Sequence, residues 1–180
     1  MTKNKKILLK FTRISLTALL TLLWLAFIYG NSLQTGVESG EASGWVHRVV
    51  NYIPELLGWG SPISEHFIRK AAHFTEFAIL GFLICSDILC IFTLSLDRPL
   101  YITASPFLVS VPLCGVFAAL DEYLQSFVDG RGPSVTDVFI DTSGALFSTI
   151  LFITIYCFIR HYRKKFISNN TISQSTHSVI

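Results

Sequence analysis

The sequence has few charged residues for its length. Of its 180 residues, 14% are charged and 51% are hydrophobic, whereas a soluble globular domain has about 25% charged residues. A soluble core of this size could not bury so much apolar surface, so the composition excludes an ordinary soluble domain. It is typical of a polytopic membrane protein that forms one compact domain.

Three further features are absent, and each absence argues against a class of protein or site. No basic stripe is interleaved with a folded polar surface, which argues against nucleic-acid binding. No small-residue cleavage site follows the first apolar run, which favours a retained helix over a cleaved signal peptide. The cysteines lack metal-ligand spacing and lie inside apolar runs, so we interpret them as small buried hydrophobic side chains. They are Cys85, Cys90, Cys114 and Cys157.

Four apolar segments are long enough to cross a bilayer, and they predict an all-α, integral membrane four-helix bundle. They cover approximately residues 14–29, 68–94, 100–127 and 135–159. The third contains Pro106 and Pro112, which predict a kink or an unwound stretch. Residues 45–53 have apolar residues at helical spacing together with Trp and Tyr, which predicts a short helix on the membrane surface.

Basic residues flank the apolar segments at both ends of the chain. Under the positive-inside rule, both termini lie in the cytoplasm. The predicted parts are a basic cytoplasmic N-terminus (1–13), a four-helix membrane domain (14–160) and a cytoplasmic polar tail (161–180). The tail is expected to be disordered beyond Phe166. The connection at 31–67 and the turn at 128–134 are then outside, and the turn at 95–98 is inside.

Ionisable residues continue into the second apolar segment without an intervening turn. Arg69, His73 and Glu76 recur at i, i+4 and i+7 and share one helix face, next to Lys70. A charge inside a bilayer costs at least about 2.5–3.5 kcal/mol, so it needs a partner or water. The candidate partners are predicted at the same outer leaflet. They are Asp121, Glu122, Gln125, Arg131, Asp137 and Asp141.

This polar cluster allows a structural interpretation and several functional ones. As a structural network, its carboxylates neutralise the cations and fix the register of the helices. However, the carboxylates outnumber the cations, which indicates altered protonation, a bound cation or a cationic ligand. His73 and Glu76, with Asp137 or Asp141, form one possible set of ligands for a divalent metal, although the cluster has no second histidine.

Acid–base catalysis and phosphate binding are also compatible with this cluster. His73 is a candidate general acid or base if a carboxylate orients it, and no serine or cysteine nucleophile pairs with it. Arg69, Lys70 and Arg131 form a candidate phosphate site near the headgroup layer. Asp87 lies deeper in the second segment, and we expect it to accept a hydrogen bond from a neighbouring helix.

Three blocks of residues resemble the VanZ-like family of small bacterial membrane proteins. The resemblance covers about residues 14–160 and depends on the order of the blocks. The blocks are Arg69-Lys70-x-x-His73-Phe74-x-Glu76-Phe77-x-x-Leu80-Gly81, Asp121-Glu122-x-x-Gln125-x-Phe127-x-x-Gly130-Arg131 and Asp137-x-x-x-Asp141-x-x-Gly144.

The resemblance implies a multi-pass protein of the bacterial cell membrane with a role in the cell envelope. The founding member of the family is associated with reduced susceptibility to teicoplanin, a glycopeptide that targets cell-wall precursors. We therefore expect the cluster to bind or modify a lipid-linked surface component or an anionic headgroup. The alternatives are a membrane-embedded hydrolase or transferase, an ion-coupled transporter and a structural partner of another membrane protein.

The candidate residues fall into two groups, and neither the cofactor nor the oligomeric state is specified by the sequence. The candidate catalytic residues are His73, Glu76, Asp121 and Asp141. The candidate ligand-binding residues are Arg69, Lys70, Glu122, Gln125, Arg131 and Asp137.

Overall fold

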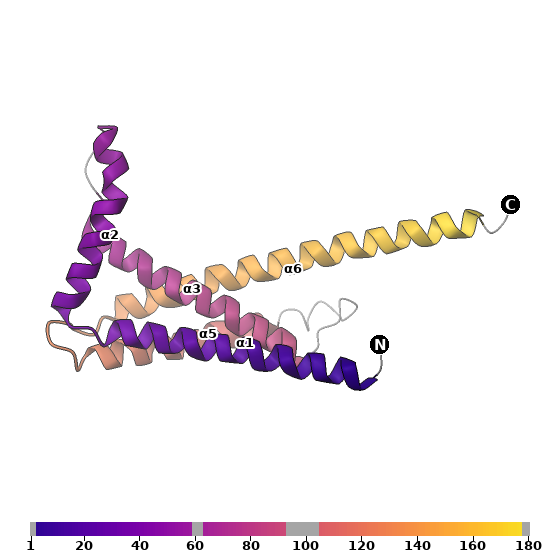
Figure 1. Ribbon diagram of the computed structural model, residues 1–180, viewed down its shortest axis with the longest axis horizontal. Helices are drawn as coiled ribbons and strands as arrows, with labels where there is room; N and C mark the ends of the chain where they lie inside the picture. The colour runs from indigo at the N-terminus through magenta and orange to yellow at the C-terminus, as the bar shows by residue number, and fades with distance from the viewer. Residues whose placement is uncertain (1–2, 59–62, 93–104, 178–180) are drawn as a thin grey trace.

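The computed structural model describes residues 3–58, 63–92 and 105–177, and these residues form helices and short connections without strands (Figure 1). Four of the helices, α1, α3, α5 and α6, each contain a stretch long and apolar enough to cross a membrane. This confirms the predicted all-α architecture with four candidate spans; the predicted turn at 95–98 lies outside the described residues. The helices are α1 (Lys3–Ser32), α2 (Gly36–Leu56), α3 (Glu65–Phe92), α5 (Ser105–Gln125) and α6 (Val135–His177).

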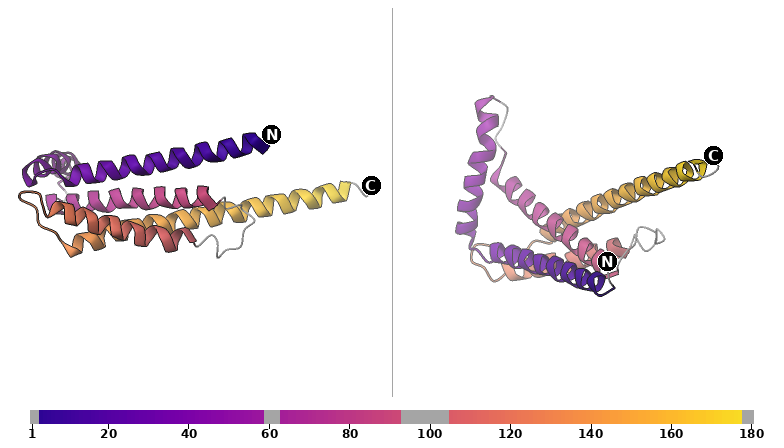
Figure 2. Two further views of the ribbon diagram at one scale, coloured as in Figure 1. Left: turned by 90° about the horizontal axis from the view of Figure 1, so that it is seen from below. Right: turned by 45° about the vertical axis from the view of Figure 1, so that its right-hand side comes forward.

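The first and last helices are longer than the apolar segments that they contain. α1 includes residues 3–13, and it begins at the end of the bundle opposite α2, where α6 also ends (Figure 2). α6 continues to His177, so the prediction of a disordered tail beyond Phe166 was wrong. The physical reason is that α6 contains neither glycine nor proline after Gly144, and these are the residues that most often end a helix.

Proline does not interrupt the third span. α5 continues through Pro112 as one helix, so the predicted unwound stretch does not occur. Pro106 lies in the first turn of α5, where a missing backbone N–H costs no helical hydrogen bond.

α3 and α6 make the most extensive contact between helices in the described part of the chain. Two glycines allow their backbones to approach closely. A Cβ on Gly81 of α3 would lie 2.9 Å from the Ala145 backbone, and a Cβ on Gly144 of α6 would meet the carbonyl oxygen of Phe74. Small residues commonly allow helices to pack backbone to backbone in membranes. This contact sets the depth at which polar residues of α3 and α6 face each other.

The interior of the bundle is partly polar. Phe77 and Leu80 are fully buried, and three small polar side chains join α3, α5 and α6 beside them. The single S–H of Cys85 has two hydroxyl acceptors within reach, those of Ser110 (3.3 Å) and Thr149 (3.6 Å), and the two hydroxyls are 3.2 Å apart. Such hydrogen bonds stabilise helix association in lipid. The four cysteines are free thiols; Cys85 and Cys114 are buried, as the sequence analysis predicts, whereas Cys90 and Cys157 are only half-buried.

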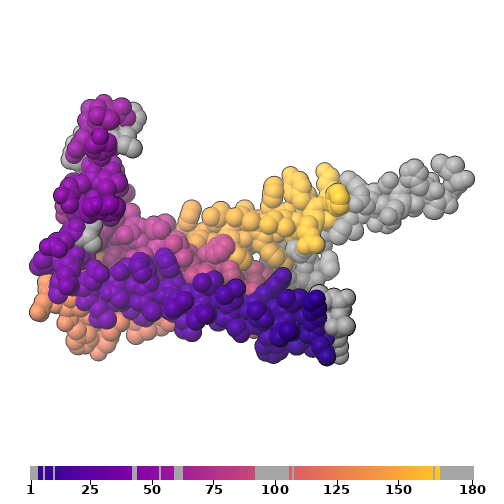
Figure 3. Space-filling model, viewed as in Figure 1, coloured from indigo at the N-terminus to yellow at the C-terminus, as the bar shows by residue number. Residues whose placement is uncertain are grey.

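α2 lies across the ends of the spans instead of along them (Figure 3). Thr35 and Glu38 form a capping box at its start: the Thr35 N–H donates to Glu38 Oε2 (2.9 Å), and the Glu38 N–H donates to Thr35 Oγ1 (3.3 Å). At the other end, buried Asn51 hydrogen-bonds the backbone N–H and C=O of Ile63, just before α3. The helix expected at 45–53 is therefore present, extended in both directions and fixed to α3.

Candidate functional site

The polar residues predicted from the sequence come together at the end of the bundle that carries α2. Asp121 and Asp141 are completely buried, and Glu122 is 4% exposed. The side chain of His73 is 17% exposed. The helices contribute as follows: α3 supplies Arg69, Lys70, His73 and Glu76; α5 supplies Asp121, Glu122 and Gln125; α6 supplies Asp137 and Asp141; and the turn before α6 supplies Arg131.

Two of the acidic residues have structural partners near the start of α6. Lys70 of α3 forms an ion pair with Asp137. The Ser134 N–H donates to Glu122 Oε2 (2.6 Å), which joins α5 to the residue before α6. Both contacts fit the structural interpretation, since each carboxylate has one donor, although Glu122 Oε1 has no partner among the described residues. A role of Lys70, Asp137 or Glu122 in binding a ligand remains a prediction.

The end of α1 supplies partners that the sequence analysis did not assign. Asn31 donates from Nδ2 to Glu76 Oε1 (3.0 Å). Gln125 donates to Asp121 Oδ2 (2.8 Å) and to the Ser32 hydroxyl (3.4 Å). Asn31 and Ser32 lie at the end of the first apolar segment, at the depth predicted for the cluster. That position was the signal that could have identified them.

The turn before α6 holds Arg131 over the end of α1. The guanidinium donates to the Ser32 carbonyl oxygen (3.1 Å). Gly130 has a φ of +78°, a conformation that glycine adopts readily. The Gly36 N–H donates to the Asp129 carbonyl oxygen (3.2 Å), so the first residue of α2 is attached to the same turn. α1, α2 and this turn therefore position Arg131 together.

Three residues form a buried group with incomplete hydrogen bonding, which we call the His73–Asp121–Asp141 group. One ligand atom from each lies within 4.8 Å of the others, and His73 Nδ1 is 4.0 Å from Asp141 Oδ1. Among the described residues, no hydrogen-bond partner reaches His73 Nδ1, Asp121 Oδ1 or either oxygen of Asp141. Buried polar atoms are normally paired because unpaired ones are costly.

A cavity of about 290 Å³ opens beside this group, and we call it the polar cavity. Two arginines, Arg69 and Arg131, line it together with His73 and Glu76. Burial and, secondly, the positive charge of Arg69 lower the pKa of the Arg131 guanidinium from its ordinary value. The cavity therefore brings two guanidinium groups together with the single carboxylate of Glu76, and the two like positive charges favour an anion. The other lining residues are Asn31, Gln34, Ser39, Val46, Ile68 and Ala72.

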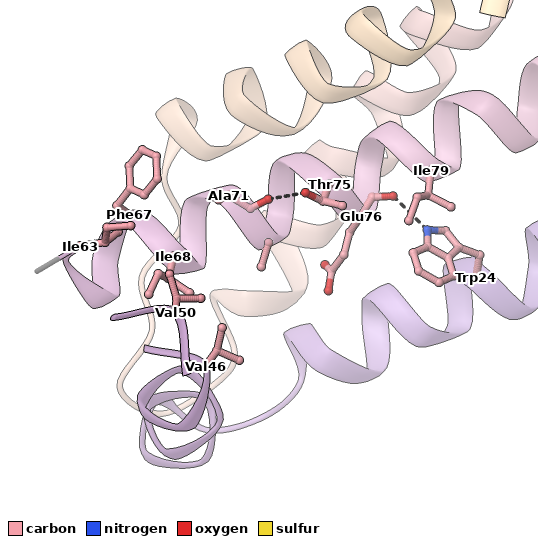
Figure 4. A pocket seen from close by; sticks show the side chains of 11 residues that line it. Trp24, Val46, Val50, Ile63, Phe67, Ile68, Ala71, Thr75, Glu76 and Ile79 are labelled. Carbon is pink, nitrogen blue, oxygen red and sulfur yellow. Dashed lines mark hydrogen bonds between the residues drawn. The ribbon is translucent and has the colours of Figure 1, made fainter. Parts of the chain in front are cut away.

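A second hollow of about 460 Å³ lies between α1, α2 and α3, and we call it the apolar groove (Figure 4). Val46 of α2 and Ile68 of α3 line both the groove and the polar cavity. Trp24 of α1 lines the groove, and its indole N–H donates to the Glu76 carbonyl oxygen (2.9 Å). The two hollows therefore share walls and form one polar and one apolar compartment side by side.

Asp87 is separate from this site. It accepts a hydrogen bond from the Thr21 hydroxyl (2.7 Å), across the interface between α1 and α3. This confirms the expected hydrogen bond to a neighbouring helix.

The fold and the cluster agree with the comparison to known families. The family model for VanZ/LLP1 matches residues 17–158, which include most of each of the four candidate spans and all of the cluster. The chain belongs to the VanZ/LLP1 family. This confirms the resemblance based on the three sequence blocks, and with the four candidate spans it makes this VanZ/LLP1 chain a multi-pass membrane protein. No curated protein and no solved structure shows significant similarity to the chain.

Proposed function

We propose that this VanZ/LLP1 protein binds a lipid with a phosphate-containing headgroup, of the kind that carries cell-wall precursors, at the outer leaflet of the bacterial cell membrane. Binding of this lipid would lower susceptibility to teicoplanin. The observation that carries the proposal is the polar cavity with two arginines, next to an apolar groove with which it shares walls. An amphiphile with an anionic head and a long hydrocarbon chain matches both compartments.

The arginines supply the recognition of the headgroup. Guanidinium groups bind phosphate through paired, charge-assisted hydrogen bonds. Arg131 is already oriented by the Ser32 carbonyl oxygen, and Arg69 lines the same cavity. An anion between them relieves the repulsion between their charges, so binding is expected to depend on the charge of the headgroup.

The apolar groove has a different role. Lipid chains are as apolar as the residues that line the groove, so a chain that moves from the bilayer into the groove gains little free energy. The groove instead sets where the chain lies when the headgroup is bound. We therefore expect a charged lipid and its neutral alcohol to differ strongly in affinity although their chains are identical.

The distribution of charge supports an outer-leaflet position. Lys5 and Arg13 near the start of α1, and Arg160 and Arg163 late in α6, lie at the end of the bundle opposite α2. Because basic residues near both chain termini lie at this end of the bundle, the positive-inside rule favours its retention in the cytoplasm. The end with α2 and the cluster then faces outward.

His73 supports a second candidate, a hydrolase or transferase acting on the same lipid. It lines the polar cavity, and its Nδ1 lies 4.0 Å from Asp141 Oδ1, a distance that a bound substrate could shorten. The test is incubation of the purified protein with a polyprenyl pyrophosphate and measurement of released phosphate. Absence of product, with and without divalent ions, would eliminate this candidate and leave binding.

Binding is tested with the full-length protein in nanodiscs of phosphatidylcholine. Replacing the other two tryptophans with phenylalanine leaves Trp24 as the reporter in the apolar groove. Polyprenyl phosphate should change its fluorescence, whereas the neutral polyprenol should not. Arg131→Gln should weaken binding at least about tenfold, because a charge-assisted hydrogen bond contributes roughly 1.5–3 kcal/mol.

Arg48→Gln is the matched control, since Arg48 is an exposed cation on α2 that does not line the polar cavity. Equal binding of the phosphate and the alcohol would refute recognition by charge. In cells, a deletion strain complemented with wild type, Arg131→Gln or Arg48→Gln is compared for teicoplanin susceptibility at equal membrane abundance. Wild type and Arg48→Gln should restore resistance and Arg131→Gln should not; equal susceptibility of all strains would refute the cellular role.

A further inference from the structure

We infer that the His73–Asp121–Asp141 group is a binding site for one divalent transition-metal ion. The inference does not depend on lipid binding, because it rests on different residues and is tested with metal alone. Four features support it: the chemistry and spacing of the donors, the unpaired state of their atoms, the charge balance and the access to the site.

The donor set is one that divalent metals use. An imidazole nitrogen and carboxylate oxygens bind zinc at about 2.0–2.2 Å, and the same combination suits manganese and iron. Two atoms that are each about 2.1 Å from one ion are at most about 4.2 Å apart. The 4.0 Å between His73 Nδ1 and Asp141 Oδ1 falls within this limit. In the tetrahedral geometry of zinc the donor atoms are about 3.4 Å apart, so side-chain rotation must close up to about 1.4 Å from the 4.8 Å bound of the three atoms.

The unpaired atoms are the second feature. Asp141 is completely buried, and both of its carboxylate oxygens lack a hydrogen-bond partner among the described residues. Asp121 Oδ1 and His73 Nδ1 are unpaired in the same way, and Gln125 holds the other Asp121 oxygen in place. Among the described residues, four of the six buried side-chain atoms without a partner belong to this group; the other two are Glu122 Oε1 and Asp87 Oδ1.

Glu76 and Asp137, which the sequence analysis considered as metal ligands, have other partners in the structure. Glu76 is held by Asn31 on the side of α1, and Asp137 is paired with Lys70. The three grouped residues come from three helices, α3, α5 and α6. A metal bound here would therefore link the three helices as well as satisfy their polar atoms.

Charge balance is the third feature. The cluster contains five carboxylates and three permanent cations, so full ionisation would leave two negative charges in excess. Asp141 interacts electrostatically with the other four acids: Asp121, Glu122, Asp137 and Glu76. A divalent ion supplies the missing charge at the residue where the negative field is concentrated.

Access is the fourth feature. His73 belongs to the group and also lines the polar cavity. The group therefore adjoins the cavity on its His73 side, and the Glu76 carboxylate in the cavity wall offsets part of the positive charge of the two arginines there. A bound ion would remain close to the cavity surface and could accept a further oxygen ligand from that side.

The experiment uses full-length protein that has been purified in detergent and stripped with a chelator. Zinc chloride is titrated by calorimetry, and cobalt is titrated while its visible absorption is recorded. One ion per chain should bind, and cobalt should show the spectrum of mixed nitrogen and oxygen ligands. Asp141→Asn and Asp121→Asn should each weaken binding by at least about 10–100-fold, since even residues that only support metal ligands have effects of this size.

Asp87→Asn is the matched control, because it removes an acid from α3 that lies 14 residues, about 21 Å along the helix, from His73. It should bind zinc like wild type. Circular dichroism and gel filtration establish whether each variant is folded. If Asp141→Asn does not fold, Asp121→Asn provides the test. Absence of stoichiometric binding by wild type, or unchanged binding by folded Asp141→Asn or Asp121→Asn, would overturn the inference.

Discussion

Replacing Gly144 with alanine is expected to separate α3 from α6. The added Cβ would meet the carbonyl oxygen of Phe74, which belongs to the backbone of α3 and cannot rotate away. The two helices must therefore move apart along the face that carries the polar cluster. Gly81→Ala should act in the same direction, because its Cβ would lie 2.9 Å from the Ala145 backbone.

The size of the expected loss of stability follows from what the added methyl group meets. Adding a methylene to a well-packed interior typically costs about 1–3 kcal/mol. Because the obstacle is backbone, we expect the Gly144→Ala cost to be about 2 kcal/mol, which corresponds to roughly a 30-fold change in the unfolding equilibrium. Phe74 follows His73 directly, and Gly144 lies one helical turn after Asp141. The same movement should therefore widen the 4.0 Å spacing between His73 and Asp141.

Gly115→Ala is the matched control. Gly115 of α5 also faces α6, but a Cβ there would lie 3.6 Å from the Thr142 hydroxyl, an ordinary contact distance. The free energy of unfolding can be measured by titrating the protein in mild detergent with sodium dodecyl sulfate and following helicity by circular dichroism. If Gly144→Ala and Gly115→Ala differ from wild type by the same amount, within about 0.5 kcal/mol, close backbone packing is not what holds α3 and α6 together.

Three further outcomes are expected. In the same titration, Thr21→Val should cost about 1–3 kcal/mol because it leaves Asp87 without its donor, whereas Thr21→Ser should not. Trp24→Phe should cost about 1 kcal/mol, since it removes the N–H donated to a carbonyl of α3. The pKa of Glu38 is lowered by the Thr35 N–H and then by the Thr35 hydroxyl. The capping box should therefore stabilise α2 above the ordinary pKa of 4.5 and weaken as the pH falls below it. Hydrogen exchange at the first turn of α2 should accelerate in acid, and Glu38→Gln should remove that dependence.

The helical periodicity of the sequence correctly predicted the features that depend on one helix alone. The start of the fourth span at Val135 and the common face of Arg69, His73 and Glu76 agree with the structure, because the helical repeat alone determines them. The length of α6 was underestimated because a polar composition was taken as disorder, although neither glycine nor proline occurs there to end the helix.

The partners across helices could not be predicted in the same way. Which acid lies nearest His73 depends on how α5 and α6 rotate against α3, and a repeat within one helix does not contain that information. The sequence analysis accordingly considered Glu76 for a metal site, whereas the structure groups Asp121 with Asp141. The contact of Asn31 with Glu76 was missed for the same reason: the order of the helices around the bundle decides it.

The position of the apolar groove between α1, α2 and α3 affects how affinity for a lipid should be expressed. A lipid that enters along the membrane meets the site at a concentration given by its mole fraction in one leaflet, not by its molarity in water. Confinement to that thin layer raises the effective concentration to the millimolar range or above, as tethering does for linked binding partners. A weak intrinsic interaction could therefore keep the site filled, and growth conditions that change the abundance of the lipid would change occupancy directly.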